Sequence, residues 1–151
     1  MSKLVPLEDV AAALNSGAIH LLRSLAEVDK LAGLTPARLS ALSVIVFGGP
    51  RSLGTLAAAE GVAGPTMTRI VDGLVSAELA ERRPDPSDGR AVEIAATPTG
   101  DALMRAAARR RISVIAEAIA ALPNADRRRL AAAAGLLDHL ATEVRSSPPA
   151  E

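Results

Sequence analysis

Residues 79–97, Leu-Ala-Glu-Arg-Arg-Pro-Asp-Pro-Ser-Asp-Gly-Arg-Ala-Val-Glu-Ile-Ala-Ala-Thr, have the pattern of two short strands joined by a loop. On the return strand Val92 and Ile94 point one way and Glu93 the other, which is the pattern of a half-buried strand. The intervening prolines and glycine are turn formers, so the loop projects instead of continuing the ladder. We therefore predict a β-hairpin with Arg90 at or near its tip.

An arginine on a projecting hairpin is suited to a narrow, electronegative minor groove of DNA. An ordinary surface hairpin with a solvated arginine accounts for this stretch equally well when it is taken alone. The residues that precede the hairpin favour the first interpretation.

Residues 52–61 predict the first helix of a helix-turn-helix. Ser52 is a suitable N-terminal cap, and Gly61 suits the positive φ of a tight turn after the helix. The predicted inner face consists of Leu53, Leu56 and Ala57.

Residues 64–78 predict the second, recognition helix, with Pro65 at its first turn, where the missing N–H costs nothing. Its core-facing positions are Met67, Ile70, Val71 and Leu74. Thr66, Thr68, Arg69 and Asp72 then lie on the outer side, and the first three have the right chemistry for base edges and phosphates in a major groove. A plain helical hairpin in a bundle is the alternative for this segment, but a hairpin of strands directly behind it favours a winged helix.

The predicted helix-turn-helix and wing are not basic overall. The formal net charge of the chain is zero, and residues 62–90 hold four arginines against five carboxylates. A DNA-binding face here would depend on how the arginines are presented, on helix N-termini directed at phosphates, and on basic residues elsewhere.

Composition excludes several classes of function. The chain of 151 residues is 49% hydrophobic, with Phe47 as its one aromatic residue and no cysteine. It contains two histidines, no cluster with metal-ligand spacing, no glycine-rich phosphate loop and no activated-serine pattern, so we expect no metal, cofactor or enzymatic activity. No apolar run reaches membrane-spanning length and no signal peptide is recognisable, so we expect a cytoplasmic, nucleoid-associated protein without membrane contact.

Long amphipathic helices flank the winged helix, over residues 7–31, 98–122 and 124–145. One small core cannot cover their apolar faces, so a second copy of the chain is the economical partner. A compact monomeric bundle is the less favoured alternative. The predicted fold is therefore mainly α with a small β-hairpin wing. Its predicted regions are a winged helix-turn-helix domain over 34–97 with its wing at 79–97, a dimerisation region over 7–33 and 98–145, and a disordered tail at 146–151.

This order of elements resembles the multiple antibiotic resistance regulator (MarR) family of bacterial transcription factors. The resemblance covers roughly residues 7–145. Its most specific part is Asp85-Pro86-Ser87-Asp88-Gly89-Arg90 followed by Ala95-Ala96-Thr97-Pro98-Thr99-Gly100, which is similar to the family's wing signature and the helix start behind it.

The resemblance implies a dimeric regulator of double-stranded DNA, commonly a repressor on a pseudo-palindromic operator. It implies that Pro65, Thr66, Thr68 and Arg69 enter the major groove. Arg90 would reach the minor groove, oriented by a charge-assisted contact with Asp88.

The resemblance also implies a small lipophilic or phenolic effector in a crevice between the dimer helices and the winged helix. We take His20, Arg23 and Phe47 as candidate lining residues. The scarcity of aromatic residues favours an aliphatic ligand or none. The competing hypothesis for the whole chain is a winged-helix protein-interaction module that has lost DNA binding.

Overall fold

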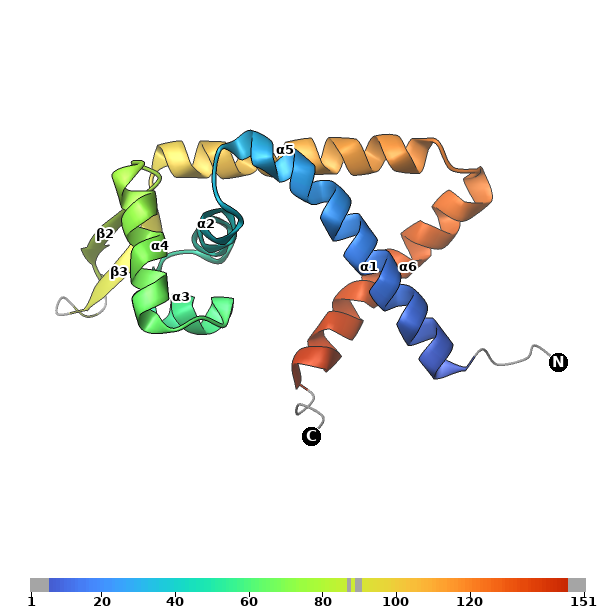
Figure 1. The fold of residues 1–151 in the computed structure, drawn as a ribbon, viewed down its shortest axis with the longest axis horizontal. Coiled ribbons are helices and arrows are strands. Elements are labelled where there is room, and N and C mark those ends of the chain that lie inside the picture. Colours follow the sequence, from blue (N-terminus) through green and yellow to red (C-terminus); the bar gives the residue numbers. More distant parts are fainter. Residues whose placement is uncertain (1–5, 87, 89–90, 147–151) are drawn as a thin grey trace. The chain divides into compact units, whose positions relative to one another are not determined.

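The structure is a computed structural model that describes residues 6–86, 88 and 91–146, apart from the side chain of Arg145. Its elements follow one another in Figure 1 as α1 (Leu7–Asp29), the 3-10 turn η1 (Lys30–Ala32), α2 (Pro36–Gly48), β1 (Arg51–Ser52), α3 (Leu53–Glu60), α4 (Gly64–Ser76), β2 (Ala80–Pro84), β3 (Val92–Ala96), α5 (Pro98–Ala120) and α6 (Asn124–Ser146). The predicted fold class, mainly α with a small β wing, is confirmed. The chain divides into two compact units, Met1–Arg111 and Ile112–Glu151.

The short helices of the first unit begin and end where local chemistry requires. The hydroxyl oxygens of Thr35 and Ser52 accept hydrogen bonds from backbone N–H groups in the first turns of α2 and α3, at 3.4 and 3.2 Å. Gly61 follows α3 with φ 63°, a left-handed conformation that glycine adopts without a Cβ penalty. The predicted first helix and its closing turn are thus confirmed, whereas α4 ends at Ser76, two residues before its predicted end.

The sheet differs from the predicted hairpin in having a third strand. Its order is β1-β3-β2, and all pairs are antiparallel. The two residues of β1 pair with Ile94 and Glu93 of β3. A strand so short carries no periodicity, which is why the sequence did not indicate it. The burial predicted for the return strand is wrong at one position, because Val92 lies at the outer end and is 53% exposed while Ile94 is 1% exposed.

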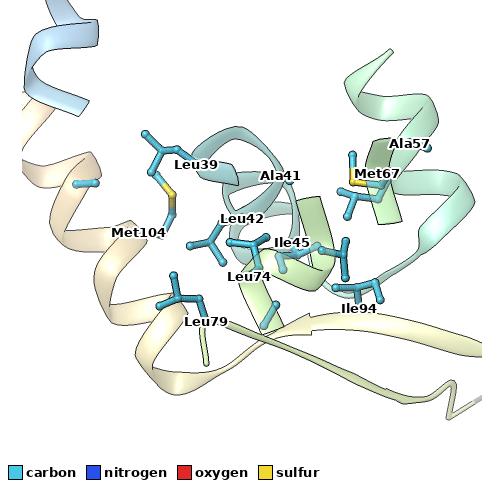
Figure 2. Close-up of a cluster of buried hydrophobic side chains, with 14 residues drawn as sticks. Leu39, Ala41, Leu42, Ile45, Ala57, Met67, Leu74, Leu79, Ile94 and Met104 are labelled. Carbon is cyan, nitrogen blue, oxygen red and sulfur yellow. The ribbon is translucent and has the colours of Figure 1, made fainter. Parts of the chain in front are cut away.

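The core of the first unit is built around α2. Figure 2 shows side chains of α2 and α4 pointing toward one another, flanked by Ile94 of β3, Leu79 before β2 and Met104 of α5. The largest fully buried side chains are Leu42, Leu56, Met67, Leu74, Ile94 and Val71. Each contributes about 1.5–3 kcal/mol through burial. The helix-turn-helix, the sheet and the first turns of α5 therefore share one core, which fixes their relative positions.

A polar junction ties the end of α4 to the start of α5. Glu78 has φ 57°, a left-handed conformation that side chains disfavour. The Thr97 hydroxyl donates to the Glu78 carbonyl oxygen at 2.7 Å and accepts from Gly100 N–H at 3.0 Å, while Thr97 N–H donates to the Leu79 carbonyl oxygen at 3.1 Å. Gly100 is buried directly against that carbonyl, which leaves no room for a Cβ.

The long helices leave much of their apolar surface uncovered. Leu25 is the one buried residue of α1, and none of the described residues of α6 is buried. The exposed large apolar side chains of α1, α6 and the second half of α5 include Leu7, Val10, Leu14, Ile19, Leu21, Leu22, Ile112, Val114, Leu130, Leu136, Leu137, Leu140 and Val144. Ser146, assigned to the tail from the sequence, is the last residue of α6, and residues 147–151 lie outside the described residues.

Within the described part of the chain, no single helix combines the length and apolar character needed to cross a membrane. The segments Leu7–Ala32 and Pro36–Gly48 meet those criteria only when taken together, and they are bent by 84° at the break between them.

Candidate DNA interface

The turn between α3 and α4 is held by backbone hydrogen bonds. Gly61 N–H donates to the Ala58 carbonyl oxygen at 3.3 Å, and Val62 N–H donates to that of Ala57 at 3.1 Å. Leu56 and Ala57 of α3 are buried in the same core as Met67 and Val71 of α4, so the two helices pack closely. This geometry presents the first turns of α4 to solvent at a fixed angle to α3.

The outer face of α4 carries the residues predicted to read DNA. Pro65, Thr66 and Arg69 are exposed, and no described residue forms an ion pair or side-chain hydrogen bond with the Arg69 guanidinium. Thr68 is half-buried, and its hydroxyl donates to the Gly64 carbonyl oxygen at 3.1 Å. The Thr68 oxygen is thus left as a hydrogen-bond acceptor, whereas Arg69 offers a full set of donors.

The hairpin follows this helix in the chain. The strands pair from Ala80 opposite Ala96 to Pro84 opposite Val92. Beyond them, Asp85 N–H donates to the Ala91 carbonyl oxygen at 2.9 Å, and Ala91 N–H donates to that of Asp88 at 2.8 Å. Asp88 is exposed on this loop, and Arg90, the predicted minor-groove residue, lies outside the described residues.

Two ion pairs hold the arginines of β2. Arg82 Nη2 lies 2.7 Å from Asp72 Oδ1 on α4, and Arg83 Nε lies 2.7 Å from Glu93 Oε1 on β3. The sequence placed Asp72 on the outer side of the recognition helix but did not indicate its partner, because the two residues belong to different kinds of element.

A cavity of about 340 Å³ lies in the first unit beside α2. Its lining consists of Ala26, Asp29, Lys30, Leu34, Pro36, Leu39, Ser40, Ser43, Met104 and Arg111. Arg111 Nε and Asp29 Oδ1 form an ion pair at 3.2 Å, and both atoms are buried without a well-directed hydrogen bond. No sequence signal links these two residues, since they belong to separate long helices that meet only in the fold.

None of the three candidate effector residues lines that cavity. His20 and Arg23 are exposed on α1. Phe47 is 57% exposed at the end of α2, with the Arg105 guanidinium 5.9 Å from its ring centre. A hydrogen bond from Arg105 Nε to Asp101 Oδ2 at 2.7 Å holds the pKa of Asp101 below its ordinary value and raises the pKa of Arg105.

Among the described residues, no group of three or more histidine, cysteine, aspartate or glutamate side chains is placed to hold a metal ion. What the fold does present is a helix-turn-helix pair whose second helix has a polar, solvent-facing side, followed by an antiparallel wing. This combination defines a winged helix-turn-helix DNA-binding protein.

Comparison with known proteins identifies the family. The model of the MarR family matches residues 32–91, and an uncharacterised HTH-type transcriptional regulator of Mycobacterium bovis, Mb0904, is 33% identical over 134 residues, spanning 89% of this chain and 94% of that protein. The crystal structure of RV1404 from Mycobacterium tuberculosis is similar with a TM-score of 0.79 and 26% identity, covering 92% of this chain and 97% of the other. That of the transcriptional regulator Tm0710 from Thermotoga maritima has a TM-score of 0.76 and 25% identity, covering 93% and 99%.

The chain belongs to the MarR family of helix-turn-helix transcriptional regulators. It is therefore a DNA-binding regulator of transcription, and members of this family are not enzymes.

Proposed function

We propose that this protein is a repressor that binds a pseudo-palindromic operator as a homodimer. The observation that carries the proposal is the solvent-facing side of α4, where the Arg69 guanidinium has no described partner and is available to DNA. Its partner would be chromosomal DNA, so we expect the protein in the cytoplasm, associated with the nucleoid.

The apolar faces of α1, α6 and the second half of α5 support the dimer. Clusters of exposed leucine, isoleucine and valine of this extent mark surfaces that bind another chain. A two-fold pair of chains would carry two winged helices and match half-sites about 10 base pairs apart. In this arrangement residues 7–33 and 98–145 form the dimerisation region and 34–97 the DNA-binding domain.

Each candidate residue then has a distinct role. Pro65, Thr66, Thr68 and Arg69 enter the major groove, with Arg69 as the donor to a base edge or phosphate. Arg90 enters the minor groove, and Asp88 orients it through a charge-assisted hydrogen bond.

The experiment that tests this proposal is fluorescence anisotropy with labelled duplexes that tile the DNA upstream of the protein's own gene, at several salt concentrations. We expect tight, salt-sensitive binding by the wild type, because neutralising phosphates releases counterions. We expect weaker binding by Arg90→Ala, with the dimer intact by sedimentation analysis.

Two results would contradict this proposal. Operator binding by Arg90→Ala equal to that of the wild type would remove the assigned role of Arg90. Salt-insensitive or absent binding by the wild type, on these and on random-library duplexes, would favour the protein-interaction module.

The cavity beside α2 supports a second proposal, that a small amphipathic anion regulates DNA binding. Its volume is at the small end of the range for ligand sites. The apolar side chains of Leu34, Leu39 and Met104 suit an aliphatic chain. Lys30 and Arg111 are the cations of the lining, and a ligand carboxylate would replace their present partners, Glu27 and Asp29. Among the described residues, no aromatic side chain lines the cavity, so a phenol would have no ring to stack on.

Octanoate, with octan-1-ol as the uncharged control, tests the cavity. We expect octanoate at millimolar concentration to weaken DNA binding of the wild type at least tenfold, and to have little effect on Arg111→Gln, which lacks the cation. Equal weakening by octan-1-ol, or an unchanged response of Arg111→Gln, would show that the effect does not pass through this site.

A further inference from the structure

The region of this chain that is proposed to face DNA is not positively charged overall. Affinity for DNA comes largely from arginine and lysine side chains at phosphates, yet residues 62–90 contain more carboxylates than arginines. The placement of individual side chains therefore decides which cations DNA can reach.

Arg82 is placed by the pleat of the sheet. It stands directly opposite Ile94 in the pairing of β2 with β3, and Ile94 is buried in the core. Residues opposite one another share a face of the sheet, so Arg82 leaves β2 on the face that packs against the helices. Its guanidinium emerges beside α4 and reaches Asp72, with Nη2 and Oδ1 2.7 Å apart.

Asp72 is the carboxylate of the recognition helix. It follows Thr68 by one helical turn, and its side chain is 55% exposed, beside that of Arg82 at 39%. The pair is thus accessible to solvent and to a polyanion, and it joins the recognition helix to the first strand of the wing.

Arg83 provides the contrast within the same strand. It stands opposite Glu93 in the β2–β3 pairing, on the other face of the sheet, and their ion pair of 2.7 Å stays within the wing. Two neighbouring arginines are therefore held by two carboxylates, but only one of these carboxylates belongs to the recognition helix.

We propose that Asp72 limits the sequence-independent affinity of this regulator for DNA by holding Arg82 in an ion pair on the recognition helix. Asp72 is then a determinant of specificity that works without touching a base. The Asp72–Arg82 pair also joins the wing to α4, and the shared core holds the two docking elements together as one body.

The effect on specificity depends on how freely the docking pose can shift on random DNA and on a preferred sequence. On random DNA the docking pose can shift until a released Arg82 meets a phosphate, so the released cation adds affinity. On a preferred sequence the base contacts fix the pose, and Arg82 adds less. Releasing Arg82 should therefore strengthen random binding more than specific binding. This part of the inference rests on the sequence-specific binding proposed above.

The test compares the full-length wild type with Asp72→Asn, Arg82→Gln and the double variant on a random-sequence duplex pool and on a duplex selected by the wild type from that pool. We expect Asp72→Asn to bind the random pool about fivefold more tightly per released arginine near physiological salt, and its salt dependence to steepen by about one per protomer. The gain on the selected duplex should be smaller. Arg82→Gln should bind the random pool more weakly, because it leaves the Asp72 charge unpaired, and the double variant should resemble the wild type.

Glu93→Gln is the matched control, since it releases Arg83 in the same strand but on the other face of the sheet. We expect it to leave the ratio of selected to random affinity unchanged. Thermal unfolding of each variant checks that the fold is retained. Asparagine keeps the shape of Asp72 and glutamine that of Glu93, whereas Arg82→Gln also shortens the side chain.

Three outcomes would overturn the proposal. If Asp72→Asn bound the random pool with the affinity and salt dependence of the wild type, Asp72 would not be keeping Arg82 from DNA phosphates. A gain that persists in the double variant would assign the effect to the lost repulsion of Asp72 alone. If Glu93→Gln lowered the ratio of selected to random affinity as much as Asp72→Asn does, the effect would not depend on an ion pair with the recognition helix. If the wild type selects no sequence, the operator proposal fails, while the random pool still tests the release of Arg82.

Discussion

Replacing Gly100 with alanine is expected to lower the free energy of unfolding by about 3 kcal/mol, which corresponds to a fall in melting temperature of roughly 10 °C. Gly100 is buried in the first turn of α5, against the backbone of Leu79. A methyl group there would overlap the Leu79 carbonyl oxygen and lie 2.9 Å from the carbonyl carbon. The neighbours are main-chain atoms of Leu79, whose carbonyl oxygen also accepts a hydrogen bond from Thr97 N–H, so they cannot move aside like the end of a long side chain.

Gly54→Ala is the matched control for this prediction. Gly54 lies in α3 with nothing within 4 Å of an added Cβ. Alanine there should raise stability by up to about 1 kcal/mol, because it restricts the unfolded chain and favours the helix. Thermal and urea unfolding of both variants provide the measurement. A Gly100→Ala protein as stable as the wild type would show that the α5 start and Leu79 do not approach this closely.

Replacing Arg69 with alanine is expected to weaken DNA binding by about 10- to 100-fold, the equivalent of about 1–3 kcal/mol. Arg69 projects from the exposed side of α4, and no described residue pairs with it, so its donors are unused in the free protein. Asp72, Arg82, Arg83 and Glu93 are all engaged in ion pairs, which makes Arg69 the most available cation among the described residues of α4 and the two hairpin strands.

Anisotropy titrations on a set of single-base-substituted duplexes distinguish a base contact of Arg69 from a phosphate contact. If Arg69 reads a base, the loss is concentrated at one position and specificity relaxes there. If Arg69 binds a phosphate, affinity falls evenly across sequences and the salt dependence becomes shallower by about one per protomer. Arg110→Ala removes the same charge from an exposed position on α5 and should bind DNA like the wild type. Equal binding by Arg69→Ala and the wild type would remove Arg69 from the interface.

Much of this fold could be predicted from local sequence because its elements have strong local signals. Ser52 and Gly61 mark the two ends of α3 by chemistry that acts within a few residues, and each occupies the expected position. The core positions Met67, Val71 and Leu74 follow from helical spacing alone. The family could be recognised because the wing motif is both specific and contiguous.

Features that depend on long-range contacts could not be predicted in this way. The strand β1 exists only through its pairing with β3, and its two residues have no pattern of their own. Glu78 stands in a left-handed conformation that usually selects glycine, so its residue type concealed the turn. The Asp72–Arg82 pair and the Asp29–Arg111 pair join residues of separate elements. The roles of the six residues assigned to DNA and of the three assigned to an effector remain predictions.

Phe47, whose ring centre lies 5.9 Å from the Arg105 guanidinium, is the one phenylalanine of a chain that has neither tryptophan nor tyrosine. The protein is therefore almost transparent in the near ultraviolet and has no useful intrinsic fluorescence. Any absorbance or emission of a mixture in that range belongs to nucleic acid or to a bound aromatic compound. Bound DNA or a bound aromatic compound can therefore be detected directly without interference from the protein, and the protein concentration must be determined from peptide absorbance or refractive index.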